Sequence, residues 1–242
     1  MLRALAQLAV RQGDLDEAER LHRENVALLG EIDDARGPMY LQIMRALLEM
    51  ARGKYADAEP LLENCADLAR ALGETFLLAV SLGNLAIVVH ARGDRERACA
   101  LFEESLTLAR DVGDVFLESH ILSYKGRAEH SDGDLVSAEA SFGESLAIAR
   151  ELADPFATMW ALERFAELAA AKHAHERAAT ILGAAARLRE GTGLSIPPHE
   201  EREHERVAAA TRAALGDDTF DLAWREGSAM DLEEAVRCAL ND

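Results

Sequence analysis

The sequence predicts an all-α solenoid, that is, an array of stacked helix pairs, and three observations lead to this fold class. The first is a turn that returns every 40 residues and is marked by Gly13, Gly53, Gly93, Gly133 and, in the fifth place, His173. The other two are columns of small residues in the same register: Ala18, Ala58, Ala98, Ala138 and Ala178, and Ala6, Ala46, Ala86, Gly126 and Ala166. A fixed period of this size is typical of proteins whose repeats bury their apolar faces only against neighbouring repeats.

Each repeat is predicted to form two helices separated by the glycine turn. The first helix has apolar residues at helical spacing, as at Leu82, Leu85 and Val89. Glycine ends a helix at little cost, and the aspartate that often follows it can cap the next helix. The predicted first helices are 2–12, 36–52, 75–92, 115–131 and 155–171, and the predicted second helices are 14–30, 54–72, 94–112, 134–152 and 173–190.

The first predicted helix is shorter than its equivalents. Its apolar face is already in register at Leu2 and Leu5, and no capping residue precedes it. We therefore expect a truncated first helix, in a segment of a longer protein whose repeats continue upstream. The alternative is a first helix that is naturally short.

The repeat pattern ends after Gly193. Residues 195–198, Ser-Ile-Pro-Pro, predict a linker, because proline removes a backbone donor and restrains the residue before it. Three further helices are expected over 199–215, 217–226 and 231–240. The predicted organisation is five repeats over residues 1–193, wound into a right-handed superhelix, and a helical cap over residues 194–242.

The bulk composition limits the function classes. Of the 242 residues 49% are hydrophobic, enough for a folded core, and the formal net charge is −18 with a pI near 4.8. So acidic a surface repels phosphate backbones and anionic lipid, which argues against direct binding of nucleic acid or a membrane. The sequence shows neither a membrane-spanning apolar stretch nor a signal peptide. Cys65, Cys99 and Cys238 fit no metal-binding spacing, and free thiols indicate a reducing cytoplasm.

The third repeat carries a family resemblance. Its Leu82, residues 84–86 (Asn-Leu-Ala), Gly93-Asp94, Ala98 and Phe102 resemble one tetratricopeptide repeat. That repeat usually has 34 residues, so both helices are longer here. The resemblance covers the whole predicted array and implies a solenoid that binds proteins, with the first helices on its concave side.

The end of the chain resembles a narrower group of proteins. The residues that carry this likeness are Glu176-Arg177-Ala178-Ala179, Leu182-Gly183-Ala184-Ala185, Pro197-Pro198, Ala214-Leu215-Gly216, Phe220, Ala223-Trp224, Gly227 and Glu233-Glu234-Ala235-Val236. They are similar to the end of the repeat region in actinobacterial-type signal-transduction ATPases, which include LuxR-type and AfsR-type transcriptional regulators. The phosphate-binding motif of such ATPases, Gly-x-x-x-x-Gly-Lys-Ser/Thr, does not occur in this sequence, so the resemblance implies a sensor or interaction arm.

The candidate binding surface is the face of each first helix that lies opposite its buried face. At helical spacing this face includes Val80, Asn84 and Ile87 in the third repeat, and its equivalents are rich in aromatic residues. The predicted site residues are Tyr40, Met44, Asn84, His90, His120, Tyr124, Arg127, His130, Trp160 and Arg164. If they line a concave groove, a peptide helix or a small effector can dock there.

Four of these residues are the expected anchors, namely Tyr124, Arg127, Trp160 and Arg164, because aromatic side chains and arginine dominate binding hot spots. The two arginines favour an acidic or anionic partner. The predicted site residues form a row along the first helices, which we call the stripe. The alternative is that the long helices curl tightly and bury the stripe against adjacent first helices, in which case it is part of the core.

Other polar groups are expected to be structural. Arg45 with Glu49, and Lys125 with Glu129, are spaced for ion pairs within a helix, and they could also bridge stacked repeats. The sequence His173-x-His175 and the stretch 199–205 contain metal-ligating residue types, but they fall at a turn and on a charged, solvated helix start. No metal, cofactor or catalytic residue is expected.

These observations predict a non-enzymatic binding module. The favoured hypothesis is a protein- or ligand-binding sensor or scaffold arm of a cytoplasmic bacterial regulator in signal transduction and transcription regulation. The alternative is a free-standing tetratricopeptide scaffold that assembles other proteins, and a phosphate-binding loop upstream in the natural chain would discriminate between the two. An enzyme whose pocket is built on the array is a third hypothesis, and no arrangement of catalytic residue types supports it.

Overall fold

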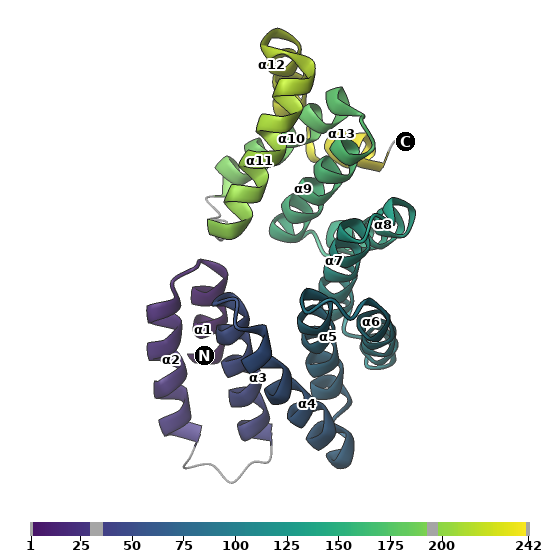
Figure 1. The fold of residues 1–242 in the computed structure, drawn as a ribbon. Helices are drawn as coiled ribbons and strands as arrows, with labels where there is room; N and C mark the ends of the chain where they lie inside the picture. Colours follow the sequence, from purple (N-terminus) through teal and green to yellow (C-terminus); the bar gives the residue numbers. More distant parts are fainter. Residues whose placement is uncertain (1, 30–35, 193–197, 241–242) are drawn as a thin grey trace. The chain divides into compact units, whose positions relative to one another are not determined.

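The computed structural model describes residues 2–29, 36–192 and 198–240, which form thirteen α-helices and no β-strand (Figure 1). The helices of the predicted repeats are α1 (Leu2–Arg11), α2 (Leu15–Leu29), α3 (Arg36–Ala51), α4 (Tyr55–Leu72), α5 (Thr75–Ala91), α6 (Arg95–Asp111), α7 (Val115–Ser131), α8 (Leu135–Glu151), α9 (Pro155–Ala171) and α10 (His175–Thr192). The last three helices are α11 (Pro198–Leu215), α12 (Asp217–Ala229) and α13 (Leu232–Leu240). The predicted all-α repeat architecture is confirmed. The greater part of the predicted linker, residues 195–197, lies outside the described residues.

The chain divides into two compact units, Met1–Ile121 and Leu122–Asp242, and the division falls within α7. In the first unit α1 packs on α2, α3 on α4 and α5 on α6, and each pair also contacts the next. In the second unit α9 lies against α8 and α10, and α10 also contacts α11, α12 and α13.

The Gly-Asp turns work as the sequence predicts. Gly93 has a φ of 93°, and its N–H donates to the carbonyl oxygen of His90 at 2.9 Å. The Asp94 carboxylate then accepts a hydrogen bond from the N–H of Arg97 at 3.2 Å, which caps α6. The aspartate is therefore the cap and not the first helical residue, so α6 begins one residue later than predicted. His173 adopts a φ of 60° in the fifth turn, a conformation that usually favours glycine.

Both small-residue columns are buried and mark where helices meet. Their buried members are Ala6, Ala46, Ala86, Gly126 and Ala166 in one column, and Ala18, Ala58, Ala98, Ala138 and Ala178 in the other. A Cβ atom at Gly126 would lie 2.6 Å from two ring atoms of Phe142, so α7 and α8 approach closely there. The columns are small because larger side chains would force the helices of a repeat apart.

Ion pairs join successive repeats with a constant polarity. The acid lies near the start of the second helix of one repeat, and the base lies at the end of the first helix of the next. The pairs are Glu19 with Arg52 at 2.7 Å, Glu59 with Arg92, and Glu139 with Lys172 at 2.6 Å. In each pair the acid precedes the base by 33 residues, the spacing that the repeat imposes.

The two charged pairs within predicted helices are structural, as expected. Arg45 lies 2.5 Å from Glu49 on α3, and its guanidinium also reaches Glu19 of the preceding repeat at 3.1 Å. Lys125 lies 2.8 Å from Glu129 on α7, and that carboxylate accepts a hydrogen bond from the Ser141 hydroxyl of α8 at 2.7 Å. Each pair therefore combines a contact within its helix with a contact to a neighbouring helix.

Two glycines let the end of the chain dock on α10. A Cβ atom at Gly183 of α10 would lie 2.2 Å from the carbonyl oxygen of Trp224, and one at Gly227 of α12 would lie 1.8 Å from that of Thr180. The Arg177 guanidinium of α10 donates to the carbonyl oxygens of Cys238 and Ala239 at the end of α13, at 2.9 and 2.5 Å. These contacts fasten α12 and α13 to α10.

Candidate interaction surface

In the first unit the side chains of the predicted stripe are partly buried. Met44 on α3 is 1% exposed and belongs to a core shared with α1 and α2, while Tyr40 is half-buried. Asn84 on α5 is half-buried, and its amide donates to the carbonyl oxygen of Val80 one turn earlier at 2.8 Å. His90 on α5 is half-buried and His120 on α7 is exposed. The accessible part of this stripe therefore consists of partly covered polar and aromatic side chains.

In the second unit the stripe brings arginines over aromatic rings. The Arg127 guanidinium lies 5.5 Å from the ring centroid of Tyr124 on α7, and both side chains are half-buried. On α9 the Arg164 guanidinium lies 5.8 Å from the ring centroid of Trp160, which is half-buried. His130, one turn beyond Arg127, is also half-buried. An arginine held over an aromatic face is a recurrent element of binding surfaces.

Arg164 differs from the other expected anchors because it is 2% exposed. The structure places α11 against α9, the helix that carries Arg164. α9 also packs on α8, α10 and α13, and every residue from 161 to 169 is buried. Arg164 is thus held within the protein, and Trp160 is the residue of this pair that reaches the surface.

A cluster of buried charges joins α9, α10 and α11. Arg164 lies 2.9 Å from Glu167, and Glu163, which is 2% exposed, forms an ion pair with Arg189 of α10. The His204 ring of α11 lies 3.7 Å from the Glu163 carboxylate. The two acids balance the two arginines, as buried charges require. Sequence analysis missed this cluster, although Glu163 and Glu167 stand out as acids within an apolar helix pattern.

His204 is held in the neutral form near pH 7 by its surroundings. Burial, followed by the charges of Arg189 and Arg164, lowers the pKa of its imidazole to about 4. The expectation of a solvated, charged helix start is wrong for this residue, whose side chain is 10% exposed. The side chains of residues 199–203 lie outside the described part of the structure.

Acid is expected to weaken the docking of α11 through His204. The pKa of His204 is lower in the folded state than its ordinary value near 6.5, so its contribution to stability is complete above that value and is lost as the pH falls toward 4. At pH 5 the expected loss is about 2 kcal/mol. Urea denaturation of the parent and of His204→Gln from pH 7.5 to 5 measures it, and the variant should show the shallower pH dependence. His120→Gln, at an exposed histidine, should follow the parent. Parallel pH profiles for the parent and His204→Gln would contradict this expectation.

The second group of metal-ligating residue types, His173 and His175, lies at a turn. The rings of His173 and His175 are 5.8 Å apart between centroids and meet edge to face. Within residues 2–29, 36–192 and 198–240, no group of three or more His, Cys, Asp or Glu side chains is placed to hold a metal ion. Among the helices described, none combines the length and apolar character that crossing a bilayer requires.

Family models match the repeats directly. Two models described as tetratricopeptide repeat match residues 2–34 and 39–111. In these segments the chain is similar to tetratricopeptide repeats. A stretch of 79 residues, 33% of the chain, is 37% identical to proteins described as HTH-type transcriptional regulators of Mycobacterium tuberculosis and Mycobacterium bovis. That stretch spans 9% of the length of each regulator.

Solved structures share the tetratricopeptide fold. BtubC (BKLC) from P. vanneervenii has a TM-score of 0.61 and 21% sequence identity, over 81% of each chain. A protein described as a kinesin light chain with nearly identical TPR-like repeats, from Podosopora anserina, has a TM-score of 0.56 and 18% identity, over 79% of this chain and 94% of its own. At this level of identity the likeness shows the fold alone.

Proposed function

We propose that this chain is a non-enzymatic binding arm of a cytoplasmic bacterial regulator that acts in signal transduction and transcription. Tetratricopeptide repeats provide a scaffold for protein binding, and the partial relatives are described as transcriptional regulators. Arg127 and Trp160 on the stripe of the second unit supply a cation and an aromatic surface, which suit an acidic peptide or a small anionic effector. The last three helices act in this proposal as a cap of the array.

The observation that carries the proposal is the combination of Tyr124, Arg127 and Trp160 on two first helices of the same unit. All three side chains are half-buried, so each has a fixed base and an accessible part. Aromatic residues and arginine that are partly immobilised before binding lose little conformational entropy when a partner docks. Arg164 belongs beneath this surface, where it supports the Trp160 ring from below and does not contact the partner.

Substitutions on the stripe are expected to remove binding without unfolding the chain. Arg127→Ala and Trp160→Ala should each lower the amount of a captured acidic peptide or effector at least tenfold, because hot-spot losses exceed about 1.4 kcal/mol. Native mass spectrometry of the chain after exposure to a bacterial extract identifies the captured species and its stoichiometry, and thermal melts verify the fold.

The matched control is Leu222→Ala, because this leucine is 59% exposed on α12 and lies outside the stripe. It should capture the same species as the parent. Equal capture by the parent, Arg127→Ala and Trp160→Ala would show that the stripe is not the binding surface.

A further inference from the structure

Exposed apolar side chains gather where the helix pairs of the first unit are joined. At two successive connections, from α4 to α5 and from α6 to α7, five large apolar side chains are between 37% and 61% exposed: Leu72, Phe76, Val112, Val115 and Phe116. We call these five residues the connection edge. Exposed apolar residues grouped in this way mark an interaction site more often than scattered single ones do.

The connection edge follows the 40-residue period, because its residues are equivalent in the two connections: Leu72 with Val112, and Phe76 with Phe116. Both helix ends close with the same left-handed turn, since Gly73 and Gly113 have φ values of 70° and 68°. Equivalent side chains therefore take equivalent places on the surface. The other phenylalanines whose side chains the structure describes are all buried, namely Phe102, Phe142, Phe165 and Phe220.

The two connections belong to one surface of the first unit. Leu68 of α4 and Leu108 of α6 both pack against the apolar cluster that contains Leu77 of α5. The Arg70 guanidinium of α4 also lies 3.0 Å from the Glu104 carboxylate of α6. The end of α4, the start of α5 and the end of α6 thus lie side by side. The connection edge begins one helical turn beyond this cluster and continues it to the surface.

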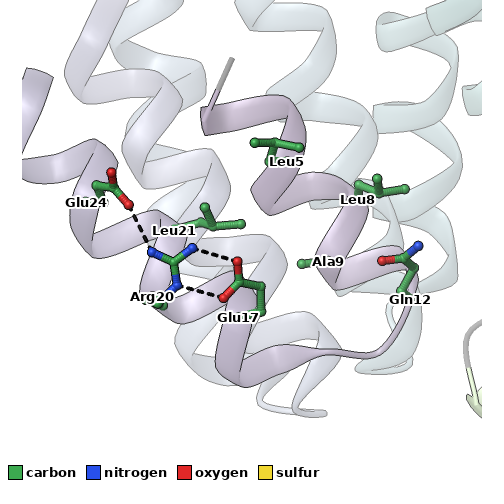
Figure 2. A pocket seen from close by; sticks show the side chains of 8 residues that line it. All are labelled: Leu5, Leu8, Ala9, Gln12, Glu17, Arg20, Leu21 and Glu24. Carbon is green, nitrogen blue, oxygen red and sulfur yellow. Dashed lines mark hydrogen bonds and ion pairs between the residues drawn. The ribbon is translucent and has the colours of Figure 1, made fainter.

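Another exposed apolar pair of the same unit has a different origin. Leu5 and Leu8 line a hollow between α1 and α2 (Figure 2) and are 43% and 49% exposed. Their equivalents on α5, Leu85 and Val88, are at most 3% exposed and share a cluster with the preceding helix α4. The structure describes no helix pair before α1, so this hollow identifies no partner. In contrast, α5 packs on both α4 and α6, and Phe76 is exposed all the same.

The connection edge is acidic. Residues 103–118, which end at its second connection, contain five acids and one base. The arginines beside the edge are already paired with acids: Arg70 with Glu104 at 3.0 Å, Arg110 with Glu118 at 2.6 Å, and Arg36 with Glu74 at 2.9 Å. Among the residues that the structure describes, Asp111 has no ion-pair partner. A cation supplied from outside would therefore meet an uncompensated carboxylate here.

The position of Asp111 is not explained by the stability of its helix. It is the last residue of α6, where the partial negative charge of the helix end disfavours an acid. It directly precedes Val112 of the connection edge, and its side chain is exposed. A lysine or arginine of a partner would be attracted by the carboxylate and by the helix end together.

We propose that the connection edge docks a basic amphipathic helix of a partner protein. The helix presents one apolar side chain to Leu72 and Phe76 and a second one to Val112 and Phe116, and it directs a lysine or arginine at Asp111. Adjacent first helices of this unit contact each other, as α3 and α5 do, so equivalent positions lie about 8–10 Å apart. Residues seven apart on a helix are separated by about 10.5 Å, which matches this spacing.

Two other assignments fit the charges less well. A second copy of this chain is disfavoured as the occupant, because each copy carries a net charge of −18 and would set acid against acid. The connection edge adjoins the stripe, since Phe116 lies one helical turn before His120 on α7. It selects the opposite charge, however, because the stripe of the second unit presents Arg127. The proposal is therefore independent of the function proposed above.

The test uses three synthetic peptides of equal length, each an alanine-rich helix. The first has two leucines seven residues apart, with lysines beside them on the same face. The second has serines in place of the leucines, and the third has glutamates in place of the lysines. Fluorescence anisotropy with the 242-residue chain, at about 0.15 M salt where charges beyond about 8 Å are screened, should show at least tenfold tighter binding of the first peptide than of either other.

Apolar variants of the chain locate the site. Leu72→Ser and Phe116→Ser should each weaken binding of the first peptide at least fivefold, because each removes apolar contact area. Leu8→Ser is the matched control: Leu8 and Leu72 are 49% and 48% exposed in the same unit, and Leu8 lies outside the connection edge. This control should bind like the parent, and circular dichroism verifies that each variant is folded.

A charge variant separates binding from stability. Asp111→Lys should weaken binding of the first peptide at least threefold and shift the preference toward the glutamate peptide. Its thermal melt should be unchanged or higher, because lysine suits the end of α6 better than aspartate does. Glu226→Lys makes the same change of charge at an exposed residue of α12, and it should bind like the parent.

Three results would overturn the proposal. Equal binding of the leucine and serine peptides would show a general attraction to an acidic protein, and parent-like binding by the double variant Leu72→Ser, Phe116→Ser would place the peptide elsewhere. A dimer in sedimentation equilibrium that Phe116→Ser converts to monomer would make a second copy the occupant. The stripe variants Arg127→Ala and Trp160→Ala should bind the first peptide like the parent, which separates this result from the outcome for the proposed function.

Discussion

Gly227→Ala is expected to release α12 from α10 and to cost more than about 3 kcal/mol, because a steric conflict with backbone cannot be relieved by a side-chain rotation. The new methyl group would lie 1.8 Å from the Thr180 carbonyl oxygen and 2.7 Å from its carbonyl carbon. The helices would have to separate, which would also break the contact of Gly183 with the Trp224 backbone. Hydrogen exchange over residues 217–229 measures the release, and the amides of this segment should exchange much faster in the variant.

Gly143→Ala is the matched control for this prediction. Gly143 lies within α8, and a Cβ atom there would have its nearest contact at 3.9 Å from a Leu240 methyl group. The substitution should therefore be neutral or stabilise the helix by up to about 1 kcal/mol. Unchanged hydrogen exchange in Gly227→Ala would mean that α10 and α12 are not packed backbone to backbone.

Arg164→Ala is expected to destabilise the second unit by about 3–5 kcal/mol, because it leaves the buried Glu167 carboxylate without the arginine that pairs with it. Glu167, whose carboxylate lies 2.9 Å from the Arg164 guanidinium, loses this ion pair, whereas the ion pair of Glu163 with Arg189 stays in place. The loss should appear as a lower urea midpoint with an unchanged slope. Arg164 is therefore unsuited to a binding test, although its type and position on the stripe suggest an anchor.

Two comparisons check this explanation. Arg150→Ala removes an arginine that is 50% exposed and 3.8 Å from Glu233, and it should cost less than about 1 kcal/mol. The double variant Arg164→Met, Glu167→Leu removes both charges of the buried pair and should recover much of the loss. Equal midpoints for Arg164→Ala and Arg150→Ala would show that the burial of Arg164 has no energetic consequence.

The helix pairs were predictable because their signals are local. The glycine turns and the caps repeat in fixed register, so the bounds of α4, α7 and α9 differ from the predicted ranges by at most one residue. The start of α6 shows an error of one residue, since Asp94 could be read from the sequence as either a cap or a first helical residue. The errors are larger for α10, which begins and ends two residues later than predicted, and for α12, which ends three residues later. Ends of helices depend on single hydrogen bonds, which a periodic pattern does not resolve.

The arrangement of the last helices was not predictable in the same way. Gly183 and Gly227 are far apart in sequence, and no period relates them, so their contact cannot be inferred from composition. The packing of α11 on α9 has the same origin, because helical spacing says which face of α9 Arg164 occupies and not which helix packs there. The acids of α9 were the available signal, since charges within an apolar helix must find partners if that helix is buried.

The ion pairs between repeats give the joined repeats a direction, because the acid lies on the earlier repeat and the base on the later one. A polymer built from unsymmetrical monomers has a direction for the same reason. Three junctions place a glutamate on the second helix of one repeat and a lysine or arginine at the end of the next first helix, as with Glu59 and Arg92, whereas Cys99 and Asp132 occupy these positions between the third and fourth repeats. A cassette that begins with a first helix, such as α3 with α4, can therefore be duplicated in tandem, since its Glu59 would meet the Arg52 of a following copy. Two cassettes joined by identical faces would instead set acid against acid or base against base. Extension of the array by gene duplication thus has one permitted direction, and symmetric pairing of repeats through identical faces is disfavoured.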